Sequence, residues 1–271
     1  MIETWEAQRF EKVLDVGRTR PLVLDCARYS PASSDQESSE SPPDHRLMVV
    51  KSLGHPEVTD TSLFCEVFGN LLAREFGVAT PMPALVNVSP EFVQAVSPLV
   101  AEYSISLTVG LGSGCEYLHG GLTPAVPGAY LTQDELEQAT LIYGFDLLVQ
   151  NPDRRWDKPN CASLSGSLIA FDFERCFSFL LPIIGGLAPP WEVSRHGIAA
   201  NHLFHATLKT RSPKWTPLID RLRGLSALRL DQLGSSLPGE WQQTAARVRD
   251  HIVEVIMNLP QFELELQRSL L

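Results

Sequence analysis

The feature that most constrains the fold is an apolar helical segment that ends in a short polar motif. Residues 132–149 begin with Thr132-Gln-Asp-Glu135, which has the form of a capping box, and continue with apolar side chains on most helical faces. A helix that is apolar all round must be buried, so it predicts a packed helical domain. The helix is expected to stop at Asn151-Pro152, which leaves Asp153 on a loop held by rigid structure.

Further polar residues follow Asp153 at a short distance along the chain. The motif 151–160 reads Asn-Pro-Asp-Arg-Arg-Trp-Asp-Lys-Pro-Asn, and Asp172 follows a predicted strand at 167–171. A charge next to a buried strand is disfavoured unless it is paired or binds metal. Asp153, Asn160 and Asp172 are the residue types that an ATP site needs. One carboxylate takes a hydroxyl proton, and an amide and a second carboxylate hold magnesium against phosphate.

The first hundred residues carry a different pattern, which is typical of strands. Residues 22–27 and 47–53 are rich in aliphatic and β-branched side chains and are predicted to be strands. Gly17 lies at a bend before the first of them, so a strand–turn–strand is expected there. The turn at Gly17, Arg18 and Thr19 either covers phosphates with its backbone N–H groups or is a plain surface hairpin, and Gly17 alone favours the hairpin.

A lysine and a glutamate form a second pattern in this region. Lys51 lies in the predicted strand 47–53, where a buried ammonium is costly unless it meets an anion. Residues 60–77 follow with apolar side chains at helical spacing, and Glu66 lies inside that apolar pattern. A strand lysine followed by a helix glutamate predicts an ion pair that aims the lysine at phosphate oxygens.

The rest of this region is expected to complete a small sheet. Residues 84–88 and 101–107 are predicted to be strands, which gives an antiparallel sheet with one inserted helix. Residues 109–130 hold six glycines and are interpreted as a connection between two lobes. Gly110-Leu-Gly-Ser-Gly114 is interpreted as part of this connector, because it does not stand between a strand and a helix as a phosphate-binding glycine loop does.

These boundaries predict two lobes, a β-rich one over residues 1–108 and a helical one over residues 109–271. Residues 30–45 are dominated by serine, proline and acid, so we expect a disordered loop there. Helices in the second lobe are predicted at 195–209, 214–226, 239–258 and over the last ten residues.

Composition excludes several classes of protein. The net charge of −10, from 22 basic and 32 acidic residues, argues against a general nucleic-acid surface or an anionic-membrane binder. No apolar run approaches the roughly 20 residues of a membrane span, and the N-terminus is too polar for a signal peptide. Five widely spaced cysteines without a Cys-x-x-Cys pair predict reduced thiols in a cytoplasmic protein. His202 and His205 lack companions at metal-ligand spacing, which disfavours a metal site there.

At Asn151-Pro-Asp153-Arg154, with Asp172 downstream, the sequence resembles the HipA-like kinases. These are bacterial relatives of the protein kinase fold, and they share the Asp-Arg catalytic loop with phosphatidylinositol kinases. The resemblance extends back to Val50-Lys51, to Glu66 in its helix, and to Gly17-Arg-Thr-Arg-Pro21. It implies an α+β, bilobal protein-kinase-like fold, with a small antiparallel β-rich N-terminal lobe holding one inserted helix and a larger, mainly helical C-terminal lobe. The site would then lie in a cleft between the lobes.

The resemblance also implies ATP and Mg²⁺ as cofactors, and a role for each matching residue. Asp153 would be the catalytic base toward a substrate hydroxyl, and Arg154 would brace the catalytic loop. The implied nucleotide-binding residues are Lys51, Glu66, Gly17, Arg18 and Thr19. The implied metal ligands are Asn160 and Asp172.

Two departures from the kinase pattern matter. The magnesium asparagine usually comes five residues after the catalytic aspartate, but that position is Lys158 here and Asn160 comes at seven. Either a longer loop brings Asn160 to the metal, or Asp157 substitutes, or only one metal binds. Asp172-Phe-Glu also replaces Asp-Phe-Gly and is similar to small-molecule kinases of the aminoglycoside and choline type, although these usually carry His-Gly-Asp before the loop.

Three functions therefore remain open. The first is phosphorylation of a serine or threonine hydroxyl on a protein, which includes the chain itself. The second is phosphorylation of a small molecule, and the third is nucleotide binding without catalysis, as in a pseudokinase. No direct nucleic-acid partner and no membrane are expected.

Overall fold

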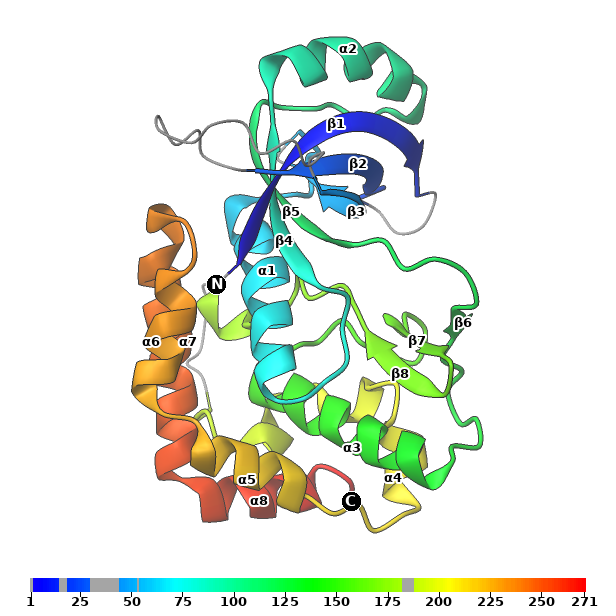
Figure 1. Cartoon of the computed structure of the whole chain (residues 1–271). Coiled ribbons are helices and arrows are strands. Elements are labelled where there is room, and N and C mark those ends of the chain that lie inside the picture. Colours follow the sequence, from blue (N-terminus) through cyan, green and yellow to red (C-terminus); the bar gives the residue numbers. More distant parts are fainter. Residues whose placement is uncertain (1, 15–18, 30–43, 53, 182–187) are drawn as a thin grey trace. The chain divides into compact units, whose positions relative to one another are not determined.

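A computed structural model describes residues 2–14, 19–29, 44–52, 54–181 and 188–271 (Figure 1). Gly17, Arg18 and nearly all of the expected disordered loop 30–45 lie outside the described residues. The chain divides into two compact units. Unit 1 comprises Met1–Val67 and Pro81–Leu118, and unit 2 comprises Phe68–Thr80 and His119–Leu271.

Unit 1 is built on a closed five-stranded barrel with the strand order β1-β2-β3-β5-β4. Neighbouring strands are antiparallel except β1 and β4, which pair in parallel and close the barrel. The prediction of an antiparallel sheet is therefore wrong for the pairing of β1 with β4. The strands are β1 (Glu3–Val13), β2 (Leu22–Arg28), β3 (His45–Lys51), β4 (Pro83–Val88) and β5 (Gly110–Glu116).

The glycine-rich string, interpreted from sequence as a connector, is strand β5 between β3 and β4. A Cβ atom on Gly112 would lie 2.6 Å from the Lys51 carbonyl oxygen, and a Cβ atom on Gly114 would lie 2.7 Å from Val86 Cγ2. Neither distance is tolerated by real side chains, so these positions require glycine for close strand approach. These glycines lower the strand propensity of the segment, but they are needed for β5 to pack between β3 and β4.

Two helices, and not one, are inserted among the strands of unit 1. Helix α1 (Asp60–Glu75) follows β3 as expected, and it continues from unit 1 into unit 2 after Val67. Thr59 caps it, because its Oγ1 accepts a hydrogen bond from the Ser62 backbone N–H at 3.1 Å. Helix α2 (Pro90–Val100) follows β4, and its N-cap Ser89 accepts from the Phe92 backbone N–H.

The strand expected at 101–107 is absent. Residues Ala101–Tyr103 form the 3₁₀ turn η1, and Ser104 ends it in the left-handed conformation with φ 57°. Ile105 is buried in the barrel core, and Tyr103 and Leu107 pack against the same core. The alternation of apolar residues therefore reflects packing of an irregular segment and not pairing in a sheet.

Unit 2 centres on helix α3 (Gln133–Leu148), for which the sequence prediction is confirmed. Thr132 and Glu135 make both hydrogen bonds of the capping box. The helix is buried along nearly its whole second half, where Ile142, Phe145 and Leu148 are at most 1% exposed. Beside it lies a three-stranded sheet of order β6-β7-β8, made of β6 (Thr123–Pro124), β7 (Cys161–Leu164) and β8 (Ser167–Ala170).

The remaining helices of unit 2 differ from the prediction in their bounds. The helix expected at 195–209 is broken into the 3₁₀ turns η3 (Val193–Arg195) and η4 (Ala199–Asn201) and helix α4 (His205–Lys209). The other helices are α5 (Thr216–Gly224), α6 (Ala227–Ser235), α7 (Gln242–Met257) and α8 (Leu259–Arg268), of which α6 was not predicted. In the described part of the chain, which includes all five cysteines, no disulfide bond is formed, as expected. Among the described residues, no helix combines the length and apolarity needed to cross a membrane.

Candidate active site

The loop after α3 takes its shape from the end of that helix. Gln150 adopts a left-handed conformation with φ 48°, and the Asn151 backbone N–H returns to the Asp146 carbonyl oxygen at 2.8 Å. The Asn151 side chain then donates to Asp146 Oδ1 at 2.9 Å and accepts from the Asp153 backbone N–H at 3.1 Å. Asn151 is buried, so this pair of hydrogen bonds fixes the backbone that presents Asp153.

Beneath the loop lies a buried ionic network that the sequence analysis did not identify. Arg154 Nε donates to Asp146 Oδ2 at 2.6 Å, and His202 Nε2 lies 3.0 Å from the same oxygen. All three side chains are 0% exposed. His202 Nδ1 accepts from the Phe204 backbone N–H, so the proton on Nε2 is donated to Asp146. A carboxylate within the apolar pattern of α3 was the sequence feature that could have predicted this network.

The network also sets the charge state of its members. Burial alone would raise the pKa of Asp146, but Arg154 and His202 outweigh burial and hold that pKa below its usual value. Burial lowers the pKa of His202, although Asp146 opposes the shift. His202 is therefore neutral near pH 7, and within this network the Arg154 guanidinium faces the Asp146 carboxylate.

The far end of Arg154 joins the loop to the sheet. Its Nη1 donates to the Phe171 carbonyl oxygen at 3.1 Å and to the carbonyl oxygen of Asn160. Its guanidinium lies 5.1 Å from the ring centroid of Phe173. These contacts bring the two ends of the β7–β8 hairpin to the residue that follows Asp153. Arg154 therefore connects the segment before Asn160 with the segment that carries Asp172.

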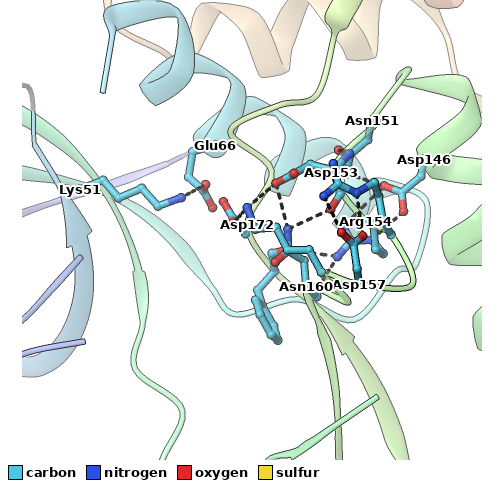
Figure 2. Close-up of polar contacts among 12 residues, drawn as sticks. Lys51, Glu66, Asp146, Asn151, Asp153, Arg154, Asp157, Asn160 and Asp172 are labelled. Carbon is cyan, nitrogen blue, oxygen red and sulfur yellow. Dashed lines mark hydrogen bonds and ion pairs between the residues drawn. The ribbon is translucent and has the colours of Figure 1, made fainter. Parts of the chain in front are cut away.

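The three polar residues of the sequence motif, Asp153, Asn160 and Asp172, lie close together (Figure 2). Two of them, Asp153 and Asp172, contact the ammonium of Lys158. Lys158 Nζ lies 2.5 Å from Asp153 Oδ2 and 3.3 Å from Asp172 Oδ2. Asn160 Nδ2 donates to the same Asp153 oxygen at 3.2 Å. Partial burial works against the charge on Lys158, but Asp172 and Asp153 outweigh it and raise the pKa of Lys158. We call Asp153, Lys158, Asn160 and Asp172 the acidic cluster.

Backbone strain supports this convergence. Asn160 and Asp172 both adopt left-handed conformations, with φ 44° and 61°. Such conformations cost energy for residues other than glycine, although Asn and Asp tolerate them best. Asp157, the alternative metal ligand, pairs through both oxygens with Arg155 at 2.8 and 3.0 Å, and both side chains are more than 40% exposed. The contacts of the loop thus favour Asn160 over Asp157 as a member of the cluster.

The other predicted site residues belong to unit 1. Lys51 Nζ of β3 lies 2.8 Å from Glu66 Oε2 of α1, and these side chains are 11% and 10% exposed (Figure 2). The expected ion pair is therefore present. Ser113 of β5, the register partner of Lys51, is buried, and its hydroxyl has no hydrogen-bond partner among the described residues. Thr19 is half-buried in a bend, whereas Gly17 and Arg18 lie outside the described residues.

The residues of the acidic cluster fit a magnesium ion. Two carboxylates already converge on one cation, and an amide lies against one of them. Oxygen ligands of this kind are those that Mg²⁺ prefers, usually one or two carboxylates together with substrate phosphates. In unit 1, a nearly buried ammonium held by a carboxylate is a suitable partner for phosphate oxygens.

Comparison with known proteins supports the fold of the chain but identifies no family for it. No family model matches the chain, and none of the curated proteins matches it. Among solved structures, the Helicobacter pylori proinflammatory kinase CtkA matches with a TM-score of 0.51 and 10% sequence identity. The match covers 97% of this chain and 99% of CtkA. The chain therefore has a protein-kinase-like fold, with a sheet-rich N-terminal region and a helical C-terminal part.

Proposed function

We propose that this protein is an ATP- and Mg²⁺-dependent phosphotransferase of the HipA-like type. The observation that carries the proposal is the convergence of Asp153 and Asp172 on one cation, with Asn160 against Asp153. The kinase-like fold and the Lys51–Glu66 ion pair support it from independent parts of the chain.

Each proposed role follows from the chemistry of phosphoryl transfer. Bound magnesium neutralises charge on the phosphates during transfer. Asp172 and Asn160 would hold that ion through oxygen atoms. Lys51, oriented by Glu66, would contact the α- and β-phosphates. Asp153 would accept the proton of the acceptor hydroxyl, and Arg154 would hold the loop that presents it.

The proposed acceptor is a serine or threonine hydroxyl on a protein, and the chain itself is one candidate. Incubation of the purified protein with γ-labelled ATP and MgCl₂ tests this directly. Label on the chain, or on an added protein mixture, is the expected result. Label on an added aminoglycoside or choline, with none on protein, would instead identify a small-molecule kinase.

The second candidate function is nucleotide binding without transfer. Lys158 favours it, because its ammonium already occupies a position between the two carboxylates. Thermal unfolding with and without Mg²⁺ and ATP separates the cases when it is combined with the labelling experiment. A stabilising shift without labelling of any acceptor would support the pseudokinase. No shift would contradict both functions, since ligands that bind the folded state must stabilise it.

A further inference from the structure

Lys158 occupies the position in the acidic cluster that a metal ion would share. Its Nζ contacts Asp153 Oδ2 at 2.5 Å and Asp172 Oδ2 at 3.3 Å, so one ammonium joins carboxylates that are far apart in sequence. The lysine side chain is 36% exposed, whereas the two carboxylates are 14% and 21% exposed. The carboxylates are thus partly enclosed, and the lysine side chain is more exposed than either of them.

The sequence around Lys158 determines how its side chain can move. Lys158 lies between Asp157 and Pro159 in the sequence, and the Asp157 carboxylate accepts hydrogen bonds from Arg155 through both of its oxygens. The Lys158 backbone N–H returns to the Arg155 carbonyl oxygen at 3.2 Å, and its own carbonyl accepts from the Arg155 N–H at 2.9 Å. The backbone of Lys158 is therefore anchored, while its four-carbon side chain keeps the freedom to swing away.

We propose that Lys158 sets the metal requirement of the site by competing with the divalent cation for Asp153 and Asp172. The ammonium neutralises the two carboxylates when no metal is bound, which keeps like charges together without mutual repulsion. A divalent cation must displace the ammonium from one or both oxygens before it can bind. The protein would then need a higher Mg²⁺ concentration than an otherwise identical site without this lysine. This inference rests on the proposed function, because it takes Asp172 as a metal ligand.

The competition predicts that a divalent cation reduces the effect of one substitution on stability. Lys158→Met removes the charge but keeps the apolar stem. Without metal, the variant should unfold at a lower temperature than the wild type, because the two carboxylates lose their shared cation. With saturating MgCl₂ or MnCl₂, that difference should shrink, since a bound divalent cation replaces the ammonium.

The decisive experiment is titration of Mn²⁺ and Mg²⁺ into the full chain by calorimetry, without nucleotide. The metal must displace the Lys158 ammonium from ion pairs that are partly exposed and therefore modest in strength. Without that competition, Lys158→Met should bind Mn²⁺ about tenfold more tightly than the wild type. Lys158→Arg, which keeps the charge, should bind no more tightly than the wild type. Arg155→Met is the matched control, because it removes a neighbouring cation that pairs with Asp157, and its metal affinity should be unchanged.

The outcomes separate this inference from the proposed function. Equal metal affinity in the wild type and Lys158→Met, or weaker binding by the variant, would overturn the competition and leave the metal site intact. Failure of every form to bind Mn²⁺, with MgATP as well as alone, would remove the metal site itself and both proposals with it. If Lys158→Met does not fold, Lys158→Gln supports the same comparison, because its amide carries no charge.

Discussion

Arg154 and Asp146 form an ion pair in which neither side chain is exposed, and their closest contact, Nε to Oδ2, is 2.6 Å. The pair joins the buried helix α3 to the loop that carries Asp153. The Arg154 guanidinium also donates to the carbonyl oxygens of Asn160 and Phe171. The position of the acidic cluster therefore depends on a charge pair that solvent does not reach.

Removal of one partner should be costly. Arg154→Met would leave the Asp146 carboxylate buried, with His202 and Asn151 as its remaining side-chain partners among the described residues. We therefore expect a loss of about 3–5 kcal/mol in the free energy of unfolding. Chemical denaturation measures it. Arg155→Met removes the next residue along the chain, whose partner Asp157 is exposed, and it should change stability by less than about 0.5 kcal/mol. Equal effects of the two variants would contradict the account of the network.

Stability should also fall in mildly acidic solution. His251 donates from Nε2 to the Leu148 carbonyl oxygen and stacks on Phe179 at 3.9 Å, and burial lowers the pKa of His251 to about 4. Because the unfolded pKa is about 6.5, the unfolded state binds the proton first, and stability that is complete above pH 6.5 is lost as the pH falls toward 4.

For His251 alone that loss amounts to about 3 kcal/mol by linkage, and His202 contributes in the same direction. Denaturation at pH 7.5, 6, 5 and 4.5 measures the slope. His251→Gln should be less stable at pH 7.5 but should show a shallower decline. A slope that is the same in both proteins would show that His251 does not titrate as described.

The glycines of β5 provide a test of the barrel. Gly112→Ala would place a Cβ atom 2.6 Å from a backbone oxygen of β3, so the strands must separate, and we expect destabilisation of about 1–3 kcal/mol. Gly239→Ala is the control, because nothing lies within 4 Å of its added Cβ atom. Thermal unfolding of the two variants compares them, and a neutral Gly112→Ala would mean that β5 is not packed as the structure shows.

The Lys51–Glu66 pair predicts a nucleotide phenotype. Lys51→Met should weaken ATP binding by about tenfold or more, because it removes a nearly buried cation that would meet phosphate. Glu66→Gln should have a smaller effect, since it frees the lysine without removing it. Lys12→Met, which removes an exposed lysine bonded to Tyr117, should bind ATP as the wild type does. Equilibrium titration with a fluorescent ATP analogue measures all three, and unchanged affinity for Lys51→Met would exclude the proposed contact.

Much of the site could be predicted from sequence because it follows regular elements. Helix α3 has its capping box and apolar faces, and β8 has its aliphatic run, so the positions of Asp153 and Asp172 beyond their ends followed directly. The Lys51–Glu66 pair was predictable for the same reason, since a strand and a helix with clear periodicity carry the two charges.

What could not be predicted depends on long-range packing. The glycines of β5 suggested a loop, because local propensity contains no information on neighbouring strands. Here a neighbouring strand lies so close that a Cβ atom would not fit. The parallel pairing of β1 with β4 is likewise not encoded by either strand alone. Asp146 and His202 are separated by 56 residues, and only the folded chain brings them to one oxygen.

The most direct test of the central claim is single-turnover transfer of labelled phosphate from MgATP by the wild type, Asp153→Asn and Asp157→Asn. Asp153→Asn keeps the shape of the side chain but cannot accept the hydroxyl proton, so transfer should fall by about 10²–10⁴-fold while ATP still binds. Asp157→Asn, a change to an exposed carboxylate in the same loop, should transfer at nearly the wild-type rate. Transfer by Asp153→Asn at the wild-type rate would contradict the assignment of Asp153 as the catalytic base.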